Sequence, residues 1–206
     1  MKHRIWLAIS FIRVISWGQP MEMSNPVPTN DKSGKAATLT SISRLRNTID
    51  FDGQVDPLEW GSDTLDFVSH WPSYSNKPNT RTRFSMAYDE KYLYFSAICY
   101  DDPGQIQGSY FERDKWGLSM EQIAILLDTY KDQENGLLFV VSPTGFRIDV
   151  SVSNDGQGEL SVDLSWNSYW EAKVTRNGEG WMMEARIPFS SLRFQLTVPS
   201  ASFRNT

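Results

Sequence analysis

Residues 82–101 read TRFSMAYDEKYLYFSAICYD, and this stretch contains two runs in which the side chains alternate with a period of two. Phe84 and Met86 share one face of the first run, and Leu93 and Phe95 share one face of the second, as in β-strands. Only the polar residues 89–91 separate the runs, which predicts an antiparallel hairpin. Because the second run is apolar or aromatic on both faces, we expect it to lie centrally in a sheet that is covered on each side.

The same pattern recurs further along the chain. A buried strand is expected at 122–127, and two more hairpins are expected, one pairing 137–142 with 146–152 and one pairing 171–176 with 181–187. Their linkers, Pro143–Gly145 and Asn177–Gly180, suit turns because Pro fixes φ and Gly permits positive φ. Residues 154–165 read as a polar loop. Since no helical periodicity of useful length is present, the sequence predicts an all-β, antiparallel β-sandwich that is jelly-roll-like.

Composition narrows the class of protein. The chain has 206 residues, of which 40% are apolar and 22% charged, as in one ordinary globular domain. A formal net charge of −5 has the wrong sign for nucleic-acid binding. Eight Trp and 13% aromatic residues are many for this length, so we expect some of them at a binding face.

The N-terminal residues have the features of a secretory signal peptide over 1–18. Lys2 and Arg4 precede an apolar run at 5–12, and Ser16 and Gly18 are small residues before a cleavage point. The alternatives are a disordered tail or a mis-assigned start. The polar residues 19–47 read as a linker that ends in a weak first strand around 38–46.

Residues that could carry catalysis are sparse. His3 lies in the leader and His70 stands alone, and no serine-hydrolase, phosphate-loop or metal-spaced motif is present. Glu112 with Glu121 could form a glycosidase pair, but nothing in their spacing demands it. The single cysteine, Cys99, reads as a small buried apolar residue.

Five segments in order resemble the family 9 carbohydrate-binding module over about residues 48–194. The segments are IDFDGQVDPLEW (49–60), YDEKYLYFSAICYDD (88–102), ILLDTYKDQENGLLFVVSPTGFRIDV (125–150), WNSYWEAKV (166–174) and GWMMEARIPFSSLRF (180–194). Within this family, the chain is most similar to the form found at the N-terminus of exported bacterial proteins that carry a large C-terminal domain of unknown function. Members of the family continue into a further strand, so the sandwich is expected to lack its last strand, with 195–206 as an irregular, truncated tail.

The resemblance implies a non-catalytic sandwich that binds polysaccharide or oligosaccharide ends. It implies a role in carbohydrate catabolism, as an accessory domain of a glycoside hydrolase or of a cell-surface assembly. The location would be periplasmic, associated with the outer membrane, or extracellular. The alternative is a structural sandwich that docks against a missing C-terminal domain and binds no sugar.

In this family a pair of Trp residues clamps the sugar, and the matching positions are Trp116 and Trp170. Asn167 matches a hydrogen-bonding Asn, and Arg113 and Gln122 are further polar candidates. Trp116 could instead pack within its loop, and Trp170 could plug the core. We expect Trp60, Trp166 and Trp181 to pack in the core rather than to contact sugar. Trp71 is an alternative candidate for contacting the sugar.

Structural calcium is the remaining cofactor question. The family can carry it, and Asp128, Asp132 and Glu134 cluster within DTYKDQENG (128–136). This segment lacks the ligand spacing of a calcium loop, so a solvated turn is the alternative.

Overall fold

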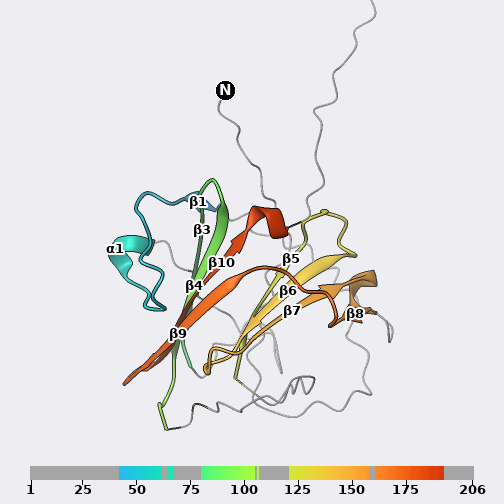
Figure 1. The fold of residues 1–206 in the computed structure, drawn as a ribbon. Coiled ribbons are helices and arrows are strands. Elements are labelled where there is room, and N and C mark those ends of the chain that lie inside the picture. Colours follow the sequence, from blue (N-terminus) through green and yellow to red (C-terminus); the bar gives the residue numbers. More distant parts are fainter. Residues whose placement is uncertain are drawn as a thin grey trace, which may run out of the picture.

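The computed structural model describes residues 42–61, 65–66, 80–104, 106, 121–157 and 161–192. Within these residues the strands form a six-stranded and a four-stranded sheet that pack together (Figure 1). All pairings are antiparallel apart from the short parallel pair at Ser43–Arg44. The predicted antiparallel β-sandwich is therefore confirmed.

The six-stranded sheet contains the hairpin from which the prediction began. Its strands follow the order β1 (Ser43–Arg44), β3 (Thr82–Tyr88), β4 (Tyr92–Tyr100), β10 (Gly180–Pro188) and β9 (Glu171–Asn177), and β2 (Leu65–Asp66) also pairs with β3. Strand β4 lies in the middle, as its two apolar faces predict. In the turn before it, Asp89 Oδ1 accepts hydrogen bonds from the backbone N–H groups of Lys91 (2.6 Å) and Tyr92 (2.7 Å).

The four-stranded sheet is a meander of consecutive strands: β5 (Ile123–Leu127), β6 (Gly136–Val141), β7 (Arg147–Val152) and β8 (Val162–Asp163). The predicted turn between β6 and β7 is present, with Gly145 at a φ of 80°. The polar loop expected at 154–165 is wrong in part, because it contains β8 and the 3-10 turn η1 (Asn154–Gly156). A two-residue strand is too short to leave a period of two in the sequence.

Only short helices occur in the part of the chain that the structure describes. Helix α1 (Pro57–Trp60) begins at Asp56, whose Oδ1 accepts a 2.8 Å hydrogen bond from the N–H of Leu58, and η2 (Phe189–Ser191) follows β10. No described helix is long and apolar enough to cross a membrane. Of the weak first strand expected at 38–46, only β1 forms, and residues 38–41 lie outside the described part.

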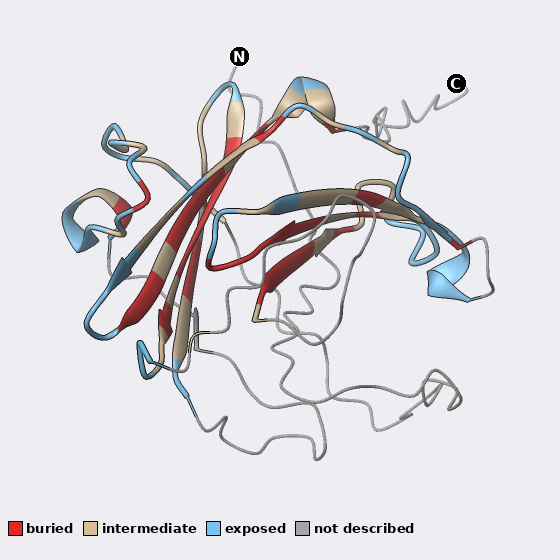
Figure 2. Cartoon of the chain, turned by 60° about the horizontal axis from the view of Figure 1, so that its bottom comes forward, coloured by how far each residue is buried: buried red, intermediate tan, exposed pale blue. Residues whose placement is uncertain are grey.

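The core lies between the sheets and is built from the inward faces of their strands. Its largest fully buried side chains include Trp181, Phe84, Phe95, Phe139 and Ile125. Figure 2 shows buried residues along the strands of both sheets and exposed residues at α1 and the turns. Cys99 is 7% exposed within this core, as predicted, and burial raises the pKa of its thiol well above the ordinary value.

A second, smaller cluster lies on the outer face of the six-stranded sheet, where residues 49–61 fold against it. Trp60 packs there with Ala87 and Tyr94, which confirms that Trp60 is a core residue. Beside them lies the fully buried carboxylate of Glu184, which accepts hydrogen bonds from the N–H groups of Asp52 (3.0 Å) and Gly53 (2.8 Å) and from Trp60 Nε1 (2.8 Å). These contacts hold the N-terminal segment against β10.

Candidate functional site

The structure describes three of the five residues predicted to bind sugar. Trp116 and Arg113 lie outside the described residues, as does the alternative Trp71. Trp170, Asn167 and Gln122 lie within the described part, and all three are near places where a strand begins.

Trp170 directly precedes β9 and is 5% exposed. Its ring meets Phe139 edge to face, with 5.1 Å between the ring centroids. The Arg147 guanidinium carbon lies 5.5 Å from the centroid of the same indole, and an Arg147 Nη atom donates a 2.7 Å hydrogen bond to the Trp170 carbonyl oxygen. A sugar ring can therefore stack on the face near Arg147 only after that guanidinium moves.

The two polar candidates differ in how far they can reach a ligand. Asn167 is exposed in the segment that connects β8 to β9. The same segment contains Trp166, which is half-buried against Phe139 and packs against the core as predicted. Gln122, at the entry to β5, is only 5% exposed, so only the edge of its side chain is open to solvent.

The glycosidase alternative rested on Glu112 and Glu121, and Glu112 lies outside the described residues. The Glu121 carboxylate accepts a hydrogen bond from Trp181 Nε1, which ties it to the core. Burial raises the pKa of Glu121, and the hydrogen bond from Trp181 opposes this shift without cancelling it. Its contacts are those of a residue that anchors Trp181.

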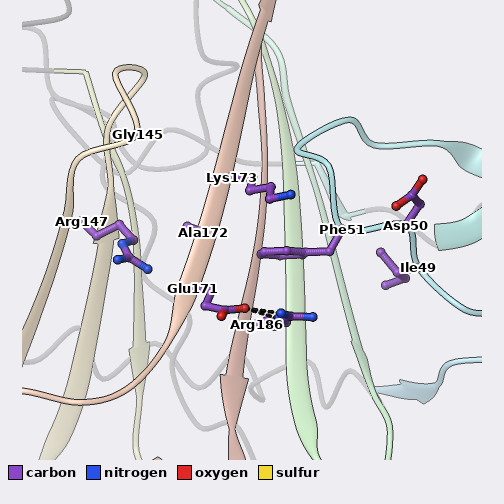
Figure 3. A pocket seen from close by; sticks show the side chains of 9 residues that line it. All are labelled: Ile49, Asp50, Phe51, Gly145, Arg147, Glu171, Ala172, Lys173 and Arg186. Atoms are coloured by element: carbon purple, nitrogen blue, oxygen red, sulfur yellow. Dashed lines mark hydrogen bonds and ion pairs between the residues drawn. The ribbon is translucent and has the colours of Figure 1, made fainter.

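A polar hollow of about 600 Å³ lies along β9, the edge strand of the six-stranded sheet. Figure 3 shows Arg147 on one side of β9, and Phe51 and Arg186 on the other. Its lining consists of Ile49, Asp50, Phe51, Gly145, Arg147, Glu171, Ala172, Lys173 and Arg186. The hollow therefore extends to both sides of the edge strand, which contributes Glu171, Ala172 and Lys173 to its lining.

Cations and aromatic rings stack along one wall of the hollow. The Lys173 ammonium lies 5.6 Å from the centroid of the Phe51 ring, and the Arg186 guanidinium carbon lies 4.5 Å from it. Arg186 also lies 5.2 Å from the centroid of Tyr92. Figure 3 shows Lys173 and Arg186 on opposite sides of the Phe51 ring, so a cation covers each face of this ring.

Glu171 is the carboxylate at the centre of the hollow. It forms an ion pair with Arg186, and its Oε1 accepts a 2.9 Å hydrogen bond from the hydroxyl of Tyr169, a residue that is 65% exposed. Partial burial opposes ionisation of Glu171, but the hydrogen bonds from Tyr169 and Arg186 outweigh it and hold its pKa below the usual value. Glu171 is thus charged and neutralises Arg186.

Sequence reasoning missed this hollow because its residues come from four separate segments. Each of Arg147, Lys173 and Arg186 reads alone as an ordinary solvated charge on a strand. One signal was available: Phe51 is an extra aromatic residue placed between Asp50 and Asp52, in an otherwise polar turn. An aromatic side chain at that position needs a partner on a neighbouring element.

The candidate calcium segment uses its carboxylates for its own turns. Asp128 Oδ1 accepts a 2.6 Å hydrogen bond from the N–H of Lys131, and Asp132 Oδ1 accepts one of 2.8 Å from the N–H of Asn135. Across the described ranges, no group of three or more His, Cys, Asp or Glu side chains is positioned to hold a metal ion. Calcium binding stays a prediction from the resemblance alone.

The described elements define an antiparallel β-sandwich with a charged hollow at the edge of one sheet. No known family model matches the chain, and no curated protein matches it. The similar solved structures include two of a family 9 carbohydrate-binding module from Caldicellulosiruptor kristjanssonii, one in complex with cellotriose and one with glucose. Both belong to the family that the sequence motifs resemble.

The extent of this similarity is modest. Each comparison has a TM-score of 0.47 and 21% identity. The match to the cellotriose complex covers 71% of this chain and 66% of the chain in that complex. This chain therefore spans slightly less than two thirds of the length of that relative. The match to the glucose complex covers 75% of this chain and 71% of the chain in that complex.

Proposed function

We propose that the chain is a non-catalytic carbohydrate-binding module that binds polysaccharide or oligosaccharide chains. The observation that carries the proposal is the contact of Arg147 with Trp170 where the chain enters β9, three residues after the exposed Asn167. A pyranose ring has apolar C–H faces that an indole covers, and hydroxyl groups that amide and guanidinium groups bind. The order of the five sequence segments supports the same function.

In this proposal Trp116 is the second face of the clamp, opposite Trp170. The Arg147 guanidinium, now 5.5 Å from the Trp170 centroid, swings aside and hydrogen-bonds to sugar hydroxyls. Asn167, Arg113 and Gln122 supply further hydrogen bonds. Because the sugar ring takes the place of the guanidinium, the Trp170 face is covered in both states, and the free protein does not expose an apolar surface.

The expected affinity is weak. If each Trp face removes about 100 Å² from water, two faces give about 5 kcal/mol at ~25 cal/mol per Å². Association itself costs at least about 4 kcal/mol, which leaves about 1 kcal/mol from the two Trp faces. Hydrogen bonds must therefore supply most of the net free energy of binding, and the dissociation constant should lie at roughly millimolar to micromolar. Titrations must therefore extend to millimolar sugar.

We further propose that the module belongs to an exported bacterial protein that takes part in polysaccharide catabolism. The positive and apolar residues of 1–18 support export. Expression of the full chain in a bacterial host, followed by fractionation and N-terminal sequencing, tests this. Recovery outside the cytoplasm with a new N-terminus at Gln19 is the expected result, and an unprocessed cytoplasmic chain contradicts it.

Sugar binding itself is tested by intrinsic Trp fluorescence during titration with xylo-, cello- and malto-oligosaccharides. We expect a saturable change with one sugar class, which Trp116→Ala and Trp170→Phe both weaken. Urea unfolding of each variant serves as the control for folding. A flat response from wild-type protein that unfolds cooperatively overturns the proposal.

A second candidate function is a docking sandwich that packs against a partner domain and binds no sugar. The observation that favours it is the exposure of Val162 (40%) and Leu164 (54%), two apolar residues in and beside the short strand β8. Val162→Ser with Leu164→Ser should leave sugar binding unchanged. If instead no sugar binds and this pair alters association with the partner domain, the docking function is favoured.

A further inference from the structure

The hollow along β9 carries more positive than negative charge, although the chain as a whole has a net charge of −5. Three cations line it, Arg147, Lys173 and Arg186, against the two carboxylates of Asp50 and Glu171. A local excess of positive charge on an acidic protein attracts anions to that place and repels them elsewhere.

The pairing within the hollow decides which cations remain available. Arg186 forms its ion pair with Glu171 and is packed against two aromatic rings, so it is fixed in place. Arg147 and Lys173 form no ion pair with any described carboxylate, and both residues are exposed. Arg147 donates one hydrogen bond to the Trp170 carbonyl and keeps further N–H donors free for a ligand.

The two available cations lie on either side of the edge strand. Figure 3 shows Arg147 beyond β9 on the side of the four-stranded sheet, and Lys173 directed towards Phe51 on the other side. A ligand that engages both must therefore reach across the edge strand. An extended chain with repeated negative charges fits this geometry better than a compact single anion.

We propose that the hollow binds an acidic oligosaccharide, with Arg147 and Lys173 contacting the carboxylates of successive uronic acid residues. This rests on the proposed function and names its substrate class. A guanidinium can hold a carboxylate through two parallel hydrogen bonds, whereas an ammonium acts as a point charge. The exposed Tyr169, whose hydroxyl donates a hydrogen bond to Glu171, supplies apolar surface for a sugar ring beside the charges.

The experiment compares acidic and neutral trimers on the full chain by isothermal titration calorimetry. The acidic probes are the trimers of galacturonic acid and of β-1,4-linked glucuronic acid. The neutral probes are cellotriose, which differs from the second acidic trimer only at the C6 groups, and xylotriose. We expect at least one acidic trimer to bind about tenfold or more tightly than either neutral trimer, and the preference to shrink at high salt.

Two matched variants test the residue assignment. Lys173→Gln removes one exposed lysine charge in the hollow, and Lys131→Gln removes one exposed lysine charge in the turn before β6. We expect Lys173→Gln to weaken acidic-trimer binding about tenfold, and Lys131→Gln to leave it unchanged. Equal weakening by both variants shows only a non-specific charge effect and overturns the assignment.

The remaining outcomes separate this inference from the proposed function. Neutral trimers that bind as tightly as the acidic ones overturn the acidic preference and leave carbohydrate binding intact. If no trimer of either kind binds, both fail. If inorganic phosphate displaces the acidic trimer at an equal concentration, the hollow is a general anion site and the sugar assignment is wrong.

Discussion

The indole nitrogen of Trp60 donates a 2.8 Å hydrogen bond to the Glu184 carboxylate, although 124 positions separate the two residues in the chain. The bond joins α1 to the middle of β10, across the outer face of the sheet. Two backbone N–H groups, of Asp52 and Gly53, share the same carboxylate. One buried side chain thus fixes the position of the whole segment 49–61, which also supplies Phe51 to the hollow.

Glu184→Ala should destabilise the protein by about 3 kcal/mol or more, because it removes the acceptor of three N–H donors, two of them buried, and opens a cavity. Urea unfolding followed by Trp fluorescence measures the loss. Glu134→Ala, at an exposed site in the turn before β6, is the control and should leave the midpoint unchanged. An equal effect of the two substitutions contradicts the anchoring role of Glu184.

The stability contribution of Glu184 should depend on pH. Burial raises its pKa above the ordinary value of 4.5, even though its hydrogen bonds favour the charged form. A carboxyl group with a raised pKa binds more protons in the folded state, so its contribution falls as pH rises from 4.5 through the raised pKa. Over that range the free energy of unfolding of wild-type protein should fall relative to that of Glu184→Gln, which does not titrate. If this difference in the free energy of unfolding changes in the opposite direction, folding favours the charged form of Glu184.

Gly180→Ala should cost more than about 3 kcal/mol, since the residue has a φ of 142° and a Cβ there would lie 2.0 Å from the Cys99 carbonyl oxygen. Gly178 lies two residues earlier in the same turn, and a Cβ there would meet open space, with no atom outside its chain neighbours within 4 Å. Gly178→Ala is therefore a matched control with little expected effect. Urea midpoints of the two variants test this. Similar midpoints would mean that the close approach of β4 and β10 at this point is not required.

Two substitutions of Trp170 should distinguish its packing role from its proposed role in sugar binding. Trp170→Ala removes a ring that packs against Phe139 and should cost about 3 to 5 kcal/mol of stability. Trp170→Phe keeps an aromatic ring in the core and should cost less, yet it should weaken sugar binding because the smaller face covers less of a pyranose ring. Retention of full binding by Trp170→Phe removes Trp170 from the clamp and leaves it as a core residue.

The strands of the central sheet were predictable because their signal is local. The alternation at Phe84 and Met86, and the polar turn at 89–91, specify a hairpin without reference to the rest of the chain. The Glu184 anchor was not predictable in this way. Glu184 lies in the run WMMEARI (181–187), where an alternating pattern suggests an outward, solvated charge, and only the folding of residues 49–61 over that face buries it.

Only the candidate residues that lie within the family-like sequence segments could be predicted. Trp170 and Asn167 could be proposed as candidates, because they belong to one short segment before a predicted strand. The hollow was not predictable, because Phe51, Arg147 and Lys173 are brought together by the packing of the two sheets and of segment 49–61. The distances between such residues depend on the register and on how β9 lies at the edge, and neither can be read from a period of two.

The reactivity of the buried Cys99 thiol reports how often the sandwich opens. Cys99 is the one cysteine among 206 residues, it lies in the core on β4, and burial holds its pKa far above the ordinary value. A thiol in this state does not react with a disulfide reagent until the two sheets separate. The rate at which the reagent labels this single sulfur atom therefore measures how often the sandwich opens. If the proposed function is right, a sugar bound across the two sheets is expected to slow that rate.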